Sequence, residues 1–116
     1  MEGLEGIVHR QRGSLGAVYQ DNRLLITPTS VFYRGVKVPF RGESVPRRIL
    51  WYLCTKADSW VGYEELWSAV FADSDLQYGA LYAYVGKLRA HLRGVGETDP
   101  KSVIVNTIGA YLYRSD

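Results

Sequence analysis

The stretch "GALYAYVGKLRAHLRG", residues 79–94, carries two helical patterns at once. Branched apolar residues recur at intervals of three and four, which is the period of a helix with one buried face. These residues are Leu81, Val85, Leu88 and Leu92. The residues diametrically opposite them are all small: Gly79, Ala83, Gly86 and Ala90. The stretch therefore predicts a helix over about residues 76–93 whose outward ridge is nearly free of side chains.

Long polar side chains flank this ridge. They are Tyr84, Lys87 and His91 on one side and Tyr82, Arg89 and Arg93 on the other. A glycine inside a helix costs about 0.5 to 1 kcal/mol relative to alanine, so such a ridge needs a reason. Deep seating in a DNA major groove supplies one, and close packing against another protein helix supplies another. The residues alone leave both explanations open.

Composition limits the class of protein. A chain of 116 residues with 47% hydrophobic and 22% charged residues fits one soluble globular domain. The net charge of +2 is too small to identify a partner, but the charges are unevenly placed. The charged residues of 57–77 are all acidic, whereas those of 78–93 are all basic. This distribution favours an oriented surface that faces a polyanion.

Several other classes find no support in the sequence. The single cysteine, Cys54, lies in the apolar run "ILWYLC" and is expected in the core. Neither His9 nor His91 stands at metal-ligand spacing, and no catalytic triad or glycine-rich phosphate loop is present. No signal peptide or membrane-length apolar run occurs. We expect a cytoplasmic protein with no catalysis, cofactor, metal or membrane contact.

The amino-terminal part reads as strands. Short runs rich in branched and aromatic residues are separated by turn residues, and these runs are "LGAVYQ", "RLLIT", "SVFYR" and "VKVPF". They predict an antiparallel sheet of three or four strands over residues 15–40. Residues 1–14 are expected to form a loose arm.

Two more helices and a hairpin follow from local signals. Ser44 as N-cap and Pro46 in the first turn predict a helix over about 44–54. A second helix is expected over about 63–71, with acidic residues in its first turn. At the carboxyl end, residues 102–114 read as two strands joined at Gly109-Ala110 by a type II′ turn with glycine in first place.

Three of these segments, in this order, carry a family resemblance: "YEELWSAVF", "LYAYVGKLRAHL" with its Leu-Arg pair, and "VIVNTIGAYLY". The chain resembles, over about residues 18–114, the OmpR/PhoB-type winged-helix DNA-binding domain of bacterial response regulators. The resemblance implies an α+β fold, a winged helix-turn-helix domain over 15–116. It has an amino-terminal sheet, a three-helix core and a carboxy-terminal hairpin called the wing.

The resemblance also implies roles for individual residues. Lys87 matches a base- or phosphate-reading position, Arg89 and Thr107 match phosphate contacts, and Phe71 matches an aromatic near the backbone. On residues alone, Arg89 has the alternative of pairing with Glu64, Glu65 or Asp73. The implied DNA-binding set is Ala80, Ala83, Tyr84, Gly86, Lys87, Arg89, His91, Arg93 and Thr107. The implied partners are double-stranded DNA, a second copy as homodimer or in tandem, and RNA polymerase.

The wing departs from the family pattern. "NTIGAYLY" lacks the arginine and the second glycine of that pattern, so the wing is about two residues shorter. This removes the side chain that would enter the minor groove. Two functions therefore remain from the sequence: a transcription regulator that places residues 76–93 in the major groove, or a protein-interaction module that uses the ridge with Tyr78, Tyr82 and Tyr84.

Overall fold

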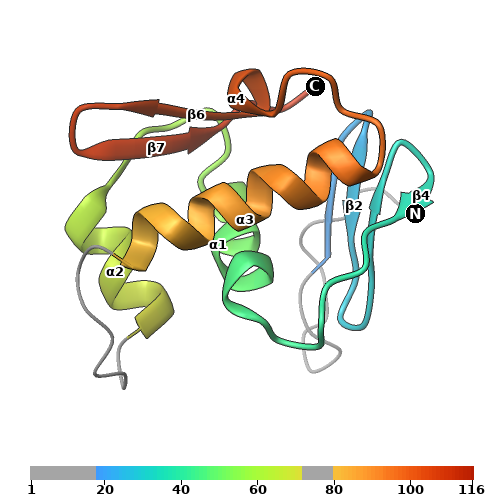
Figure 1. The fold of residues 1–116 in the computed structure, drawn as a ribbon, viewed down its shortest axis with the longest axis horizontal. Helices are drawn as coiled ribbons and strands as arrows, with labels where there is room; N and C mark the ends of the chain where they lie inside the picture. Colours follow the sequence, from blue (N-terminus) through green and yellow to red (C-terminus); the bar gives the residue numbers. More distant parts are fainter. Residues whose placement is uncertain (1–17, 72–79) are drawn as a thin grey trace.

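The computed structural model describes residues 18–71 and 80–116 (Figure 1). The expected loose arm over 1–14 and the first residues of the helix expected from 76 lie outside the described residues, as does Tyr78. In the described part, the element order is a sheet, three helices and a hairpin, with one short strand and one short helix between them. This is the predicted α+β winged-helix architecture, and the expectation is confirmed.

Four short strands form the amino-terminal antiparallel sheet in the order β1-β2-β3-β4. Their bounds are β1 Tyr19–Gln20, β2 Leu24–Ile26, β3 Val31–Tyr33 and β4 Val36–Lys37. Alternate residues of β2 and β3 are buried, as the period of two requires. Arg34 and Gly35 turn the chain between β3 and β4 with φ of 50° and 81°, the left-handed values of a type I′ hairpin.

Three helices pack together: α1 Val45–Thr55, α2 Tyr63–Phe71 and α3 Ala80–Gly94. The second of these covers the residues that the sequence predicted. Helix α1 lies against both α2 and α3 and contributes Ile49, Leu50 and Leu53 to the core. Cys54 is buried at the end of α1, as expected, and burial raises the pKa of its thiol.

Ser44 precedes α1 as predicted, but its side chain does not cap the helix. Its hydroxyl is buried and makes no hydrogen bond with any residue that the structure describes. The first turn is instead held by the backbone, where the Arg48 amide donates to the Ser44 carbonyl at 3.0 Å, and by Pro46. Proline suits this position because its missing N–H would have no helical partner there.

The wing forms a second antiparallel sheet in the order β5-β7-β6. Its strands are β5 Val61–Gly62, β6 Ile104–Thr107 and β7 Ala110–Tyr113, and the short helix α4 Pro100–Val103 precedes β6. Strand β5 and helix α4 were not predicted from the sequence. Each is too short to show a period, and β5 runs directly into α2.

The turn of the wing differs from the expected one. Thr107 pairs with Ala110, so the two turn residues are Ile108 and Gly109. Glycine therefore stands second, with φ of 76°, and Ile108 has no positive φ. The predicted type II′ turn with glycine first is wrong, because a positive φ at the second position is the requirement of a type II turn.

Asp21 joins the two sheets. Its carboxylate accepts hydrogen bonds from the hydroxyl of Tyr19 at 2.7 Å and from the hydroxyl of Tyr113, at the end of the wing, at 2.6 Å. It also accepts from the backbone amides of Arg23 at 2.9 Å and Leu24 at 2.8 Å. This one side chain fixes the wing against the amino-terminal sheet.

Candidate nucleic-acid interface

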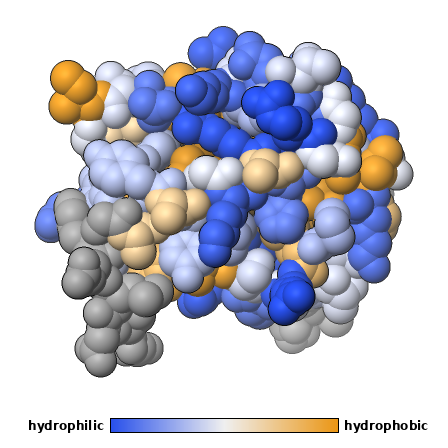
Figure 2. Space-filling view, in the orientation of Figure 1, coloured by the Kyte–Doolittle hydropathy of each residue, from blue (hydrophilic) through white to orange (hydrophobic). Residues whose placement is uncertain are grey.

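Helix α3 has the two faces that the sequence predicts. Its apolar residues Leu81, Val85, Leu88 and Leu92 are buried. Ala83, Gly86 and Ala90 are exposed on the opposite side. A Cβ atom added to Gly86 would meet no atom within 4 Å, so packing inside the protein does not require glycine there. Figure 2 shows pale and tan atoms running along α3 with dark blue, hydrophilic atoms on both sides.

Lys87 stands beside this ridge on an aromatic support. Its ammonium lies 4.9 Å from the centroid of the half-buried Tyr84 ring, within the range of a cation–π contact. The Tyr84 ring in turn lies 5.8 Å from Phe71, which is buried at the end of α2. Aromatic packing therefore holds the lysine charge close to α3.

Arg89 is directed toward the wing. Its Nε donates to the carbonyl oxygen of Ile104 at 3.1 Å, and its Nη2 donates to Oδ1 of Asn106 at 2.9 Å. Burial lowers its pKa, although an arginine of this kind stays protonated. The alternative pairing with Glu65 is not found, because Glu65 accepts from Tyr52 and lies near Lys56. Arg89 fixes the wing to α3.

Glu64 and Asp73 are the other carboxylates considered for Arg89. Glu64 makes no ion pair with a described residue, and Asp73 lies outside the described residues. The phosphate contact that the resemblance implies for Arg89 stays a prediction.

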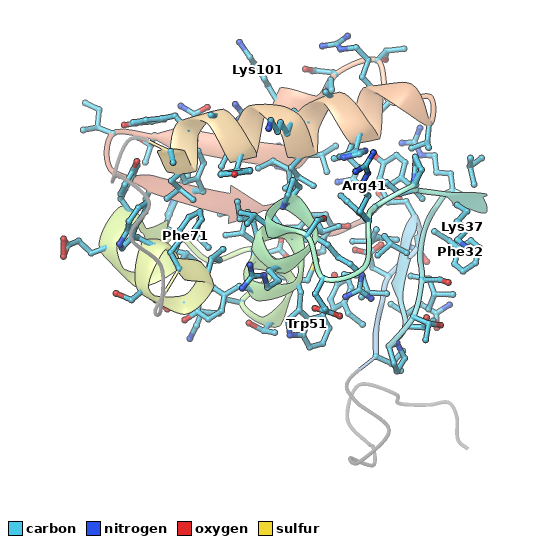
Figure 3. The ribbon with its side chains drawn as sticks, turned by 60° about the horizontal axis from the view of Figure 1, so that its bottom comes forward. Phe32, Lys37, Arg41, Trp51, Phe71 and Lys101 are labelled. Carbon is cyan, nitrogen blue, oxygen red and sulfur yellow. The ribbon has the colours of Figure 1, made fainter. Side chains whose placement is uncertain are left out.

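His91 packs against the segment that follows β4. Its ring lies 4.7 Å from the Phe40 ring, centroid to centroid, and it is half-buried. This contact places the next residue, Arg41, beside α3, where Figure 3 shows its side chain. Arg41 and Arg93 are both exposed, and neither side chain makes a hydrogen bond or ion pair within the described ranges. Arg41 could not be predicted from the sequence, because only this tertiary contact brings it to α3.

The wing and the start of α3 complete the site. Ala80 is half-buried as the first described residue of α3, and Thr107 is exposed at the end of β6. Ile108, at the tip of the wing, is fully exposed. The structure thus brings the predicted α3 residues onto one helix, with Thr107 attached to it through the contacts of Arg89.

Three tyrosines connect α3 to α2 and the wing. The Tyr82 ring lies 5.2 Å from Tyr63 and 6.4 Å from Tyr111, centroid to centroid. Burial is the largest cause that raises the pKa of Tyr111 to about 12, so its hydroxyl is neutral at physiological pH. Tyr82 remains 63% exposed, which leaves one aromatic face beside the ridge open to a partner.

The described residues contain no group of three or more histidine, cysteine, aspartate or glutamate side chains placed to hold a metal ion. None of their helices is long and apolar enough to cross a membrane.

The chain has a winged-helix fold, and solved structures similar to it include an OmpR/PhoB homolog. A DrrB response regulator of Thermotoga maritima, an OmpR/PhoB homolog, matches with a TM-score of 0.67 at 20% identity. EmbR of Mycobacterium tuberculosis, solved with a low-affinity phosphopeptide, matches with a TM-score of 0.64 at 22% identity. Each alignment covers 84% of this chain, but only 44% of DrrB and 25% of EmbR. No family model matches the sequence, and no curated protein matches it.

Proposed function

We propose that this chain is a cytoplasmic, DNA-binding transcription regulator that places α3 in the major groove. One observation carries the proposal. The outward ridge of α3 is nearly free of side chains, and exposed cations at Lys87, Arg93 and Arg41 border it without ion pairs among the described residues. The shared fold with a response regulator supports the same conclusion.

The ridge suits a groove because small residues let the helix backbone come close to the base edges. The methyl groups of Ala83 and Ala90 could meet thymine methyl groups, which are exposed in the major groove. Lys87 supplies a charge for a base or phosphate, but it lacks the bidentate geometry of arginine. Few polar side chains stand on the ridge, so we expect specificity to come from shape and methyl contacts more than from hydrogen bonds.

Three exposed cations give few phosphate contacts for one protomer. Binding as a dimer or in tandem would double this number and is part of the proposal. A contact with RNA polymerase, implied by the resemblance, belongs to the same proposal, and transcription from the selected site in a purified system would test it.

The deciding experiment is a titration against random duplex DNA at low and moderate salt, followed by amide shift mapping and sequencing of the retained DNA. We expect shifts on residues 80–93 and an enriched motif. Lys87→Ala should weaken binding by about 1 kcal/mol or more, the scale of one charged contact. The matched control is Lys37→Ala, since Lys37 is exposed on β4, away from α3 (Figure 3). Equal loss in both variants would contradict the proposal.

A second function is favoured by one observation, the 63% exposure of Tyr82 beside the ridge. Tyrosine is enriched at protein interfaces because its ring is rigid and its hydroxyl can still bond. In this alternative, the ridge binds a protein helix. The same titration would then give diffuse shifts and no enriched sequence.

A further inference from the structure

A cavity of about 420 Å³ opens on the amino-terminal sheet, beside the turn from β1 to β2 and the turn from β3 to β4. This volume is within the range of small-molecule sites. Leu25 and Phe32 line the cavity and pair directly across β2 and β3. Both are half-buried and alternate with buried residues, so they lie on the outer side of the sheet. Figure 3 shows Phe32 on the side away from the helices, and the two residues give the cavity an apolar floor.

Two arginines stand opposite one another at the edge of this floor. The backbone amide of Arg34 donates to the carbonyl oxygen of Arg23 at 2.6 Å, so the two residues face each other across the strands. Both line the cavity. Like charges directly opposite one another destabilise a strand pair, and a bound anion would relieve this repulsion.

The charge of Arg23 is not balanced by an ion pair with any described residue. Its Nη2 donates to the carbonyl oxygen of Arg114, and its Nε is buried without an acceptor in the described part of the chain. Asp21 also lines the cavity, but its carboxylate already accepts from two tyrosine hydroxyls and two backbone amides. An unsatisfied donor on a buried polar group is costly, so this guanidinium favours an additional acceptor.

Arg34 is also available to a ligand. Its side chain is 57% exposed, and the nearest carboxylate oxygen, on Glu97, lies 3.7 Å from its Nη2, which is too far for a hydrogen bond. That carboxylate accepts instead from the Tyr33 hydroxyl at 2.5 Å and from the Asp99 amide at 2.9 Å. The Arg34 guanidinium therefore keeps donors for a further partner.

Together these groups indicate the chemistry of the ligand. Guanidinium groups bind carboxylates through paired, charge-assisted hydrogen bonds. An inorganic anion would leave the apolar floor unused, whereas the ring or chain of an organic acid would pack on Phe32 and Leu25. Ligand sites commonly combine such an apolar wall with a few charged groups that fix orientation.

We propose that this cavity binds a small organic carboxylate, with its charge between Arg23 and Arg34 and its apolar body on Leu25 and Phe32. The site lies on the amino-terminal sheet and not on α3. It does not need DNA and goes beyond the proposed function, so the DNA titration described above can succeed or fail independently of it.

Amide shift mapping of the full chain without DNA tests this, with benzoate as the probe and benzyl alcohol and inorganic phosphate as comparisons. We expect benzoate to give saturable shifts on residues 20–25 and 32–35, with a dissociation constant of about 1 mM or less. Benzyl alcohol has the ring without the charge, and phosphate has the charge without the ring. Both should bind at least tenfold more weakly than benzoate.

Arg34→Gln should weaken benzoate binding at least tenfold, and because Arg34 is exposed this variant should fold. Arg23→Gln is the second variant, and the amide spectrum of each shows whether it folds. The matched control is Lys101→Gln, since Lys101 is an exposed cation on α4, far from Phe32 (Figure 3). It should bind benzoate like the wild type.

Three results would overturn the proposal. The first is benzoate shifts that do not saturate or that fall on other residues. The second is inorganic phosphate or benzyl alcohol binding as tightly as benzoate, since the site would then recognise only the charge or only the ring. The third is a folded Arg34→Gln or Arg23→Gln variant that binds benzoate as the wild type does.

Discussion

Asp21 shows how much one side chain can hold in place. Burial by itself raises the pKa of this carboxyl group, but hydrogen bonds from Tyr113, the Arg23 amide and Tyr19 outweigh it, so the pKa is lowered. A carboxyl group whose pKa is lower in the folded state stabilises the fold above its unfolded pKa of about 3.9. That contribution is lost as the pH falls through the folded pKa.

Replacing this carboxylate should therefore change both stability and its pH dependence. We expect Asp21→Asn to lower the free energy of unfolding by about 1 to 3 kcal/mol at pH 7, the scale for disrupting hydrogen bonds to a charged, partly buried group. Urea unfolding at pH 7 and at acidic pH measures the effect. The wild type should lose more stability on acidification than the variant, and equal losses would show that Asp21 does not cause the pH dependence.

At the scale of elements, two cations of α3, Lys87 and Arg89, have different roles that cannot be told apart from the sequence. Lys87 is exposed on the outward side, whereas Arg89 bonds the wing. We expect Arg89→Ala to lower the free energy of unfolding by about 1.5 to 3 kcal/mol, the scale of hydrogen bonds to a charged group. Lys87→Ala should change it by less than about 0.5 kcal/mol. Equal effects of the two variants in chemical denaturation would contradict this division.

Gly86 allows the helix itself to be tested. Apart from its chain neighbours and the backbone of its own helix, no atom lies within 4 Å of a Cβ added at Gly86, and glycine is a poor helix former. We expect Gly86→Leu to leave stability unchanged or raise it by up to about 1 kcal/mol. The same variant should weaken DNA binding at least tenfold if the ridge enters a groove. Unchanged binding would exclude close approach of α3 to DNA, and Gly86→Ala serves as the milder control.

Elements with a long periodic sequence pattern could be predicted, whereas those too short to show a period could not. Helix α2 carries a full amphipathic period and acidic residues in its first turn, so its bounds could be predicted. Strand β5 is two residues long and offers no period at all. The turn at Ile108 and Gly109 could not be predicted either, because register within a hairpin is fixed by cross-strand pairing.

The candidate site was predictable only where it lies on one helix. The residues of α3 follow from helical geometry, but Arg41 reaches α3 only because Phe40 packs on His91. The direction of the Arg89 side chain could not be predicted either, since the atoms that accept its hydrogen bonds belong to Ile104 and Asn106 of the wing. Contacts between distant segments leave no periodic signal in a single sequence.

For the whole molecule, the number of exposed cations beside α3 determines how strongly the affinity for DNA depends on the salt concentration. Three phosphate contacts, from Arg41, Lys87 and Arg93, predict a slope of log affinity against log salt of about −3 per protomer. We expect Arg41→Ala to reduce this slope by about 1. Fluorescence anisotropy at several salt concentrations measures it, with Lys37→Ala as control. An unchanged slope in Arg41→Ala would remove this residue from the interface.

The bond between Tyr113 and Asp21 joins residues that are 92 positions apart. During synthesis, Asp21 leaves the ribosome long before Tyr113 is made. The hydrogen bond that joins the amino-terminal sheet to the wing therefore forms only after β7 has been made, and the short strands of this sheet gain little stability alone. Contacts between residues so far apart in the sequence slow folding, because the entropy of closing the long loop is lost before the contact can stabilise the fold. This domain should accordingly complete its fold only after Tyr113 has left the ribosome, and a nascent chain stalled before Tyr113 should remain sensitive to protease.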